Sequence, residues 1–261
     1  MSETSVLERP VDLRSDKPAV DIPEHIVEVI SDSGEGAQRC GQSLAAIAAR
    51  SGNGIWTVEI IPAEIQPPAR SVAGASGIRI RIGSKRVTNG GDQTDLVVAF
   101  NEQVLLGRVK AGELKKGATI ILESMWREHA DPAIAASYAN TVTALREGGF
   151  HLIEAPLERE CRKLVADARK GKNMFVLGML CSIYSLDLGL ARAQIALIFG
   201  KKDEKVIASN VKLMEAGFAW AEQQLDFKYR IPAAKITEPQ VVVSGNTAIA
   251  LGVLASGMDI C

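Results

Sequence analysis

The predicted fold follows from one stretch, IVEVISDSGEGAQRCGQ, at residues 26–42. It begins with an apolar run typical of a buried strand and passes through a glycine-rich turn. It then takes on the periodicity of a helix over residues 37–50, and residues 55–61 follow as a second predicted strand. The first 60 residues therefore predict a β-loop-α-β unit, whose crossover is expected to be right-handed.

The turn carries glycines at Gly34, Gly36 and Gly41. A loop before a helix N-terminus presents backbone N–H groups and partial positive charge, which suit a phosphate or a carboxylate. The third glycine is too far along for the G-x-G-x-x-G dinucleotide fingerprint, and the Gly-Lys-Ser/Thr of a Walker A loop is absent. The residues disfavour an NAD site and leave two readings open: an anion-binding loop, or a tight turn that packs a helix onto a strand.

The rest of the chain alternates strand and helix patterns. Apolar runs at 95–100 and 118–123 suit buried parallel strands, and alternating apolar and basic residues at 78–83 predict a half-exposed strand. The other predicted elements are helices at 133–149 and 158–171, a strand at 150–156 and an almost wholly helical segment at 173–227. This order predicts an α/β fold, with a Rossmann-like, mostly parallel sheet and flanking helices, followed by a helical C-terminal part.

Composition shifts divide the chain into four parts. We expect a loose N-terminal arm at 1–24, the main domain at 25–229, a linker at 230–240 and the truncated start of a second α/β domain at 241–261. No residue from 239 to 258 is charged, but Ser-Gly-Asn-Thr interrupts the run, so strand, turn and helix are favoured over a membrane span. The chain is therefore expected to be part of something longer, with this tail disordered or docked on its own domain or on a second copy.

The net charge and the spacing of the cysteines disfavour several classes of function. The 30 basic and 31 acidic residues give a net charge of −1, which disfavours partners such as nucleic acid or an anionic membrane. The 4 cysteines are widely spaced and form no C-x-x-C pair, so a metal or iron–sulfur site on this chain is not expected. A polar, proline-containing N-terminus without a signal-peptide pattern predicts a cytoplasmic protein.

Individual polar residues are weak candidates for a site. Arg70 lies in the proline-rich loop 62–77, where its guanidinium could meet a phosphate, although a solvated arginine fits the sequence as well. Asn101 and Glu102 follow a predicted strand at the carboxyl edge of the sheet, and Asn101 could equally cap the next helix. Capping or a core hydrogen bond also explains two further asparagines, Asn173 and Asn210.

Six stretches, taken together and in order, carry a family resemblance. They are DSGEGAQRCGQ (32–42), IIPAEIQPPARSVAGASGIRIRIGS (60–84), GDQTDLVVAFNEQ (91–103), LKKGATIILES (114–124), KNMFVLGML (172–180) and VSGNTAIALGVLASGMDIC (243–261). In this order the chain resembles the alpha chain of the 2-oxoacid:ferredoxin oxidoreductases, in particular the 2-oxoglutarate type. The resemblance equates residues 26 to about 230 with that family's gamma domain, and the final segment with the opening of its pyrimidine-binding thiamine-fold domain.

The resemblance implies an activity that the residues themselves do not show. Such enzymes convert a 2-oxoacid and coenzyme A to acyl-CoA and carbon dioxide, and pass two electrons to ferredoxin. Thiamine diphosphate, magnesium and an iron–sulfur cluster are expected mainly on a partner beta subunit. The chain is then one subunit of a hetero-oligomer and inactive alone.

The resemblance also assigns residues to a coenzyme A site. They are the loop residues Asp32, Ser33, Gly34, Glu35 and Gly36, with Arg70, Asn173 and Asn210. At the position of Arg70 the family more commonly has lysine, and the alignment there can shift by one or two residues. The alternatives are a non-catalytic nucleotide- or CoA-binding Rossmann-like module and an assembly domain whose loop holds no ligand.

Overall fold

A computed structural model describes residues 17–64, 66–200, 202–234, 238 and 241–258. Its centre is a six-stranded sheet in the order β3-β4-β2-β5-β6-β7. The strands are β2 (Glu24–Asp32), β3 (Gly54–Ile60), β4 (Ala75–Gly83), β5 (Thr94–Ala99), β6 (Leu114–Glu123) and β7 (His151–Ala155). β2, β5, β6 and β7 pair in parallel, and only β4 runs antiparallel to its two neighbours. The predicted α/β fold with a mostly parallel sheet is confirmed.

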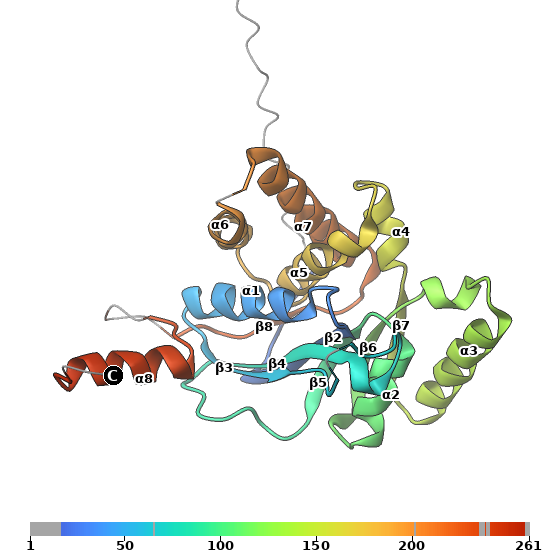
Figure 1. Cartoon of the computed structure of the whole chain (residues 1–261), viewed down its shortest axis with the longest axis horizontal. Coiled ribbons are helices and arrows are strands. Elements are labelled where there is room, and N and C mark those ends of the chain that lie inside the picture. The colour runs from blue at the N-terminus through green and yellow to red at the C-terminus, as the bar shows by residue number, and fades with distance from the viewer. Residues whose placement is uncertain (1–16, 65, 201, 235–237, 239–240, 259–261) are drawn as a thin grey trace, which may run out of the picture.

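Helices cover both faces of the sheet (Figure 1). One face carries α1 (Ala37–Arg50), α4 (Leu157–Arg162), α5 (Lys172–Ile183), α6 (Leu188–Phe199) and α7 (Glu204–Gln224). The other carries α2 (Glu102–Lys110) and α3 (Pro132–Glu147). Two apolar cores result, one on each side of the buried central strands, and the larger includes the helical C-terminal part that the sequence predicted.

The helix α5 forms the centre of the larger core. All of its 12 residues are buried, and it packs against α7 on one side and α1 on the other. A Cβ atom on Gly178 would lie 1.8 Å from the carbonyl oxygen of Met214, and one on Gly217 would lie 1.9 Å from that of Phe175. Only glycine permits two helix backbones to approach so closely, so these two positions fix how α5 sits against α7.

Two local predictions were wrong. The run at 78–83 is not a half-exposed strand: it belongs to the internal strand β4, and its Arg79 is buried in an ion pair with Glu28, with a 2.8 Å distance between Nε and Oε1. The predicted helix at 158–171 is also interrupted. α4 ends at Arg162, and only the 3₁₀ turn η3 (Ala168–Lys170) precedes α5. Arg79 can be buried because the Glu28 carboxylate offsets the cost of burying its charge. An alternating sequence pattern carries no information about such a partner.

The two ends of the main domain lie together. β1 (Val20–Asp21) pairs in parallel with β8 (Tyr229–Arg230), and the Asn53 amide donates to the carbonyl of Ile231 at 3.1 Å. Residues 17–24, which the sequence placed in a loose arm, are thus held by backbone pairing, while residues 1–16 lie outside the described part.

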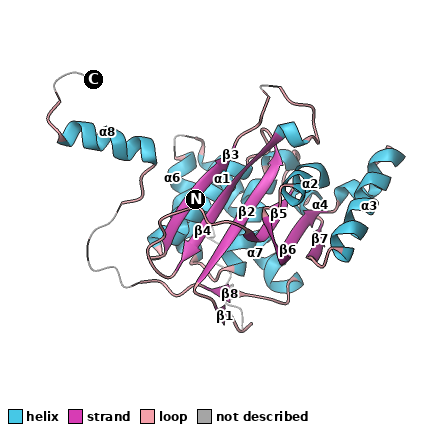
Figure 2. Cartoon of the chain, turned by 90° about the horizontal axis from the view of Figure 1, so that it is seen from below, coloured by secondary structure: helices cyan, strands magenta, loops and turns pink. Residues whose placement is uncertain are grey.

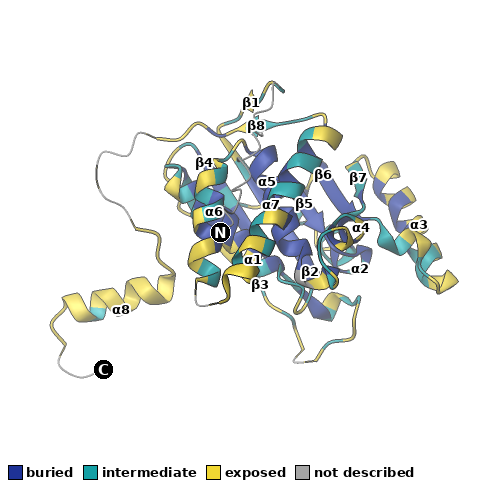
Figure 3. Ribbon diagram, turned by 90° about the horizontal axis from the view of Figure 1, so that it is seen from above, coloured by how far each residue is buried: buried dark blue, intermediate teal, exposed yellow. Residues whose placement is uncertain are grey.

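The C-terminal tail projects from the domain (Figures 2 and 3). The predicted strand at 241–243 does not form, because these residues have no partner strand in the described structure. The helix α8 (Gly245–Ala255) does form, with Ser244 Oγ accepting from the Thr247 N–H at 3.1 Å. Its apolar side chains are exposed in this chain: Ile249 is 68% exposed and Leu254 74%. None of the described helices is long and apolar enough to cross a membrane.

We predict that Gly178→Ala destabilises the fold by about 1–3 kcal/mol or more, because the new methyl group collides with the backbone of α7. Urea unfolding followed by tryptophan fluorescence measures the effect. Gly252→Ala is the matched control, since this helical glycine of α8 has nothing within 4 Å of a built Cβ. Equal stability of the two variants would contradict the packing argument.

Candidate functional site

The carboxyl ends of the parallel strands form the site. From β2 the chain enters α1 on one face of the sheet, and from β5 it enters α2 on the other, so the strand order reverses between β2 and β5. Open α/β sheets bind ligands in the crevice at this switch point. The glycine loop after β2, the start of α2 and the ends of β6 and β7 all lie at this edge.

The glycine loop has a conformation that requires glycine. Gly34 has φ 89° and Gly36 has φ 85°, both in the left-handed region. Gly36 is the N-cap of α1, and no side chain of the described residues caps this helix. The N–H groups of the first turn lack intrahelical partners and stay available to an anion. The third glycine, Gly41, has a packing role, since its Cβ would lie 2.0 Å from the Ile78 side chain.

The structure brings Asn173 to this loop. A Cβ atom at Gly36 would lie 2.6 Å from the Asn173 Nδ2, so the loop and the start of α5 are in direct contact. Asn173 is 9% exposed, and its Oδ1 accepts from the Met174 N–H at 2.9 Å. Two residues 137 positions apart in the chain are thereby neighbours in the site.

Arg70 also lies at the crevice, in a constrained conformation. Its φ is 53°, in the left-handed region, and its backbone N–H donates to the Asp32 Oδ2 at 2.8 Å. Its guanidinium forms an ion pair with Glu102 and lies 4.6 Å from the centre of the Trp126 ring. Four buried atoms here have no hydrogen-bond partner among the described residues: Asp32 Oδ1, Arg70 Nε, Asn101 Nδ2 and Glu102 Oε2.

The other loop residues are anchored differently, and Asn210 lies on a separate helix, α7. The Ser33 N–H donates to the Gly74 carbonyl at 3.1 Å, which fixes the loop to the opposite side of the crevice. Asn210 lies on α7, where its amide donates to the Val206 carbonyl of the same helix at 2.7 Å. It is one turn before Leu213, whose side chain faces Gly171 at the start of α5. The site therefore unites the loop, Arg70 and Asn173, with Asn210 on the neighbouring helix.

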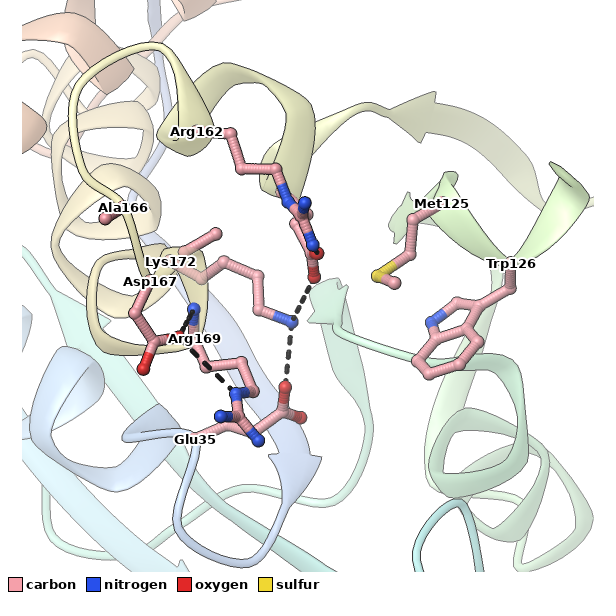
Figure 4. Close-up of a pocket in the computed structure, with 10 residues that line it drawn as sticks. Glu35, Met125, Trp126, Arg162, Ala166, Asp167, Arg169 and Lys172 are labelled. Carbon is pink, nitrogen blue, oxygen red and sulfur yellow. Dashed lines mark hydrogen bonds and ion pairs between the residues drawn. The ribbon is translucent and has the colours of Figure 1, made fainter. Parts of the chain in front are cut away.

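A hollow of about 370 Å³ adjoins the loop (Figure 4). Glu35 and Lys172 form one wall and Met125 and Trp126 the facing wall, while Arg162 comes from the end of α4 and Arg169 from η3. Sequence reasoning missed the contributions of Trp126 and Lys172. Their partners lie far away in the chain: Lys172 pairs with Glu35, and Trp126 lies against Arg70.

Glu123 ends β6 beside this hollow and is fully buried. Its carboxylate accepts from the N–H groups of Met125 at 3.0 Å and Glu158 at 2.8 Å. Burial nevertheless dominates and raises the pKa of Glu123 from 4.5 to about 7. The carboxyl therefore changes charge near neutral pH.

The described residues contain no group of three or more His, Cys, Asp or Glu side chains that could hold a metal ion. Cys40, Cys161 and Cys181 are buried free thiols. Burial raises the pKa of Cys161 and Cys181 to about 12, and that of Cys40 also upward. Such thiols are protonated at neutral pH, so they are poor nucleophiles and poor ligands for iron.

A glycine loop at the switch point of a mostly parallel sheet is typical of α/β proteins that can bind an anion at the carboxyl edge of the sheet. Comparison with known proteins gives the family. The model of the pyruvate ferredoxin/flavodoxin oxidoreductase family matches residues 28–220, and the chain belongs to that family. The 2-oxoglutarate oxidoreductase subunit KorA of Mycobacterium tuberculosis is 29% identical over 250 residues, which cover 89% of this chain and 37% of KorA.

Solved structures share the fold. The 2-oxoglutarate:ferredoxin oxidoreductase of Magnetococcus marinus, solved with 2-oxoglutarate, coenzyme A and succinyl-CoA, matches 91% of this chain and 38% of its own, with a TM-score of 0.71 and 24% identity. The gamma subunit of a keto/oxoacid ferredoxin oxidoreductase from Geobacter sulfurreducens matches 76% of this chain and 98% of its own, with a TM-score of 0.52 and 17% identity. This chain thus spans little more than a third of its longer relatives.

We predict that the contribution of Glu123 to the free energy of unfolding falls as pH rises from 4.5 to 7. Because its pKa is raised in the folded state, the folded protein holds a proton that the unfolded chain has lost in this window. The contribution is about 3 kcal/mol, at 1.4 kcal/mol per pKa unit. Glu123→Gln should flatten the dependence in urea unfolding between pH 5 and pH 8.

Burial lowers the pKa of His25, so the contribution of this residue to stability rises with pH. The effect is the same in wild type and in Glu123→Gln. The difference between the two pH dependences therefore reports Glu123 alone. Glu59→Gln, at an exposed carboxylate on β3, is the control and should keep the wild-type dependence. An unchanged slope in Glu123→Gln would show that this carboxyl is not the group involved.

Proposed function

We propose that the chain is the gamma-type domain of an alpha subunit in a thiamine-dependent 2-oxoacid:ferredoxin oxidoreductase, with the start of the next domain at its C-terminus. The observation that carries the proposal is the glycine loop at the β2/β5 switch point, in contact with Asn173 and Arg70, within a chain of this family. The substrate is 2-oxoglutarate, since both the curated relative and the solved structure with the higher TM-score are 2-oxoglutarate enzymes. In the reaction, the carboxylate carbon leaves as carbon dioxide, the acyl group joins the coenzyme A thiol, and two electrons reach ferredoxin.

The part of this chain is to bind coenzyme A. The ligand's phosphates suit the first-turn amides at the N-terminus of α1, and a guanidinium at Arg70 can pair with a phosphate oxygen. The proposed site consists of Asp32, Ser33, Gly34, Glu35, Gly36, Arg70, Asn173 and Asn210. The solved Magnetococcus marinus enzyme, which has coenzyme A bound, supports the choice of ligand.

Thiamine diphosphate, magnesium and an iron–sulfur cluster do not fit the described residues. No metal-binding cluster lies among them, and the described thiols are buried and protonated. In this proposal these groups lie mainly on a partner beta subunit, in a cytoplasmic hetero-oligomer that passes electrons to ferredoxin. Neither nucleic acid nor a membrane is a partner in this proposal.

A non-catalytic CoA- or nucleotide-binding module is the second candidate. It is favoured by the gamma subunit of the Geobacter sulfurreducens enzyme, a separate chain that this protein matches over 98% of that subunit's length. Co-purification with a thiamine-binding subunit and 2-oxoglutarate-dependent ferredoxin reduction decide between the candidates. Coenzyme A binding without any such activity in the assembled subunits would favour the module.

We predict that Gly34→Val weakens coenzyme A binding at least about tenfold, because a β-branched residue cannot hold φ 89° and the loop amides turn away. Isothermal titration of coenzyme A into the chain assembled with its partner measures the affinity. Gly112→Val is the matched control: its glycine also has positive φ, 71°, and nothing within 4 Å of a built Cβ, but it lies far from the loop, after α2. Equal affinity in both variants would rule out the loop as the binding element.

A further inference from the structure

Lys172, the first residue of α5, is an unusual feature of the site because it is almost completely buried. Its side chain is only 1% exposed. An unpaired ammonium in such a position would cost several kcal/mol, so lysines are rarely buried without a partner. The partners of this ammonium therefore show what holds it there.

Lys172 connects three parts of the carboxyl edge. Its Nζ lies 2.8 Å from the Glu35 Oε1 in the glycine loop and 3.9 Å from the Glu158 Oε2 on α4. It also lies 5.2 Å from the centre of the Phe100 ring, which directly follows β5. Figure 4 shows the ammonium next to the Glu35 carboxylate, at the hollow beside the loop.

Glu35 carries this connection into the backbone of the loop. Its Oε1 accepts from Lys172, while its Oε2 accepts from the backbone N–H of Asp32 at 3.2 Å. The carboxylate thus closes the loop on itself and attaches it to α5 at the same time. The adjacent Asn173 packs directly on Gly36, so the start of α5 holds the loop at two points.

The carboxylates around Lys172 outnumber it. Glu35 and Glu158 both face the ammonium. Arg162 pairs with Glu158 from the solvent side, with a 2.6 Å distance between Nη2 and Oε1. The buried ammonium of Lys172 therefore holds the Glu35 side chain toward α5.

We propose that Lys172 is a positioning residue for the anionic ligand of the glycine loop. By holding Glu35, it fixes the loop amides in a converging arrangement and keeps a carboxylate away from the incoming phosphate. The inference rests on the proposed function for the identity of the ligand, coenzyme A, but not for the ordering of the loop. A purely structural ion pair is the alternative, since buried pairs often contribute little net stability.

The experiment compares Lys172→Met and Lys172→Arg with wild type in the chain assembled with its partner subunit. Hydrogen exchange of the amides of residues 33–38 reports loop order, and steady-state kinetics give KM for coenzyme A and kcat separately. Lys172→Met should speed loop exchange at least about tenfold and raise KM about tenfold or more, with kcat at saturating coenzyme A within about twofold. Lys172→Arg, which keeps the charge, should restore most of both losses.

If Lys172→Met does not fold, two further variants test the same inference. Glu35→Gln removes the charge on the loop side of the pair, and Lys172→Met/Glu35→Gln removes the pair without leaving an uncompensated carboxylate on the loop. Both variants should show the same loss of loop order and of coenzyme A affinity. Lys115→Met is the control, since this lysine pairs with Asp95 at the opposite edge of the sheet and is 49% exposed.

Each outcome decides the question. Loop exchange unchanged in every variant that removes the pair would overturn the inference, as would a disordered loop that leaves KM for coenzyme A intact. If wild type does not bind coenzyme A at all, the proposed function fails, and the exchange data alone then decide whether Lys172 orders the loop.

Discussion

The close contact between the backbones of α5 and α7 is the constraint on which the rest of the structure depends. Glycines at 178 and 217 let the two helices touch, and α5 is buried along its whole length as a result. Because α5 cannot shift or rotate within this packing, its first residues are held at the carboxyl edge of the sheet. The loop after β2 is shaped against that fixed end, as the contact between Gly36 and Asn173 shows.

Charge at the site is balanced within the protein. Arg70 pairs with Glu102, and Lys172 pairs with Glu35, so neither buried cation is an isolated charge. A phosphate at this edge would therefore depend chiefly on loop amides and the dipole of α1, with Arg70 adding directed donors. Such a site discriminates by geometry more than by net charge, which agrees with a chain whose overall charge is only −1.

The sequence predicted what depends on local pattern and missed what depends on distant partners. The apolar runs that became β5 and β6 lie where expected, because a fully buried strand has a distinctive composition. The antiparallel insertion of β4 between β2 and β3 was not predicted, since strand pairing is decided by packing across the sheet and leaves no local signal. Arg79 is a second example. Its basic side chain predicted an exposed position, but it is buried and paired with Glu28, a residue on another strand.

In the site, the glycine spacing and the asparagine before Met174 were visible as motifs, whereas the link between Glu35 and Lys172 joins residues 137 positions apart. No pattern in one sequence encodes such a pair. The C-terminal tail shows that a clear local pattern is not sufficient either. Its strand-turn-helix pattern was plain, but residues 241–243 form no strand because a strand needs a neighbour as well as β-branched residues.

The surroundings of Arg70 suit an arginine in particular. A left-handed backbone at a non-glycine residue costs about 1–3 kcal/mol, so the contacts of Arg70 have to compensate for it. The Asp32 carboxylate holds its backbone N–H, Glu102 pairs with one edge of the guanidinium, and the Trp126 ring lies against the guanidinium plane. A lysine ammonium has neither the planar face nor the fixed fork of donors, so it could not lie against the Trp126 ring and pair with Glu102 in the same way. Glu102 and Trp126 thus form surroundings that suit the planar guanidinium of an arginine and fix its direction.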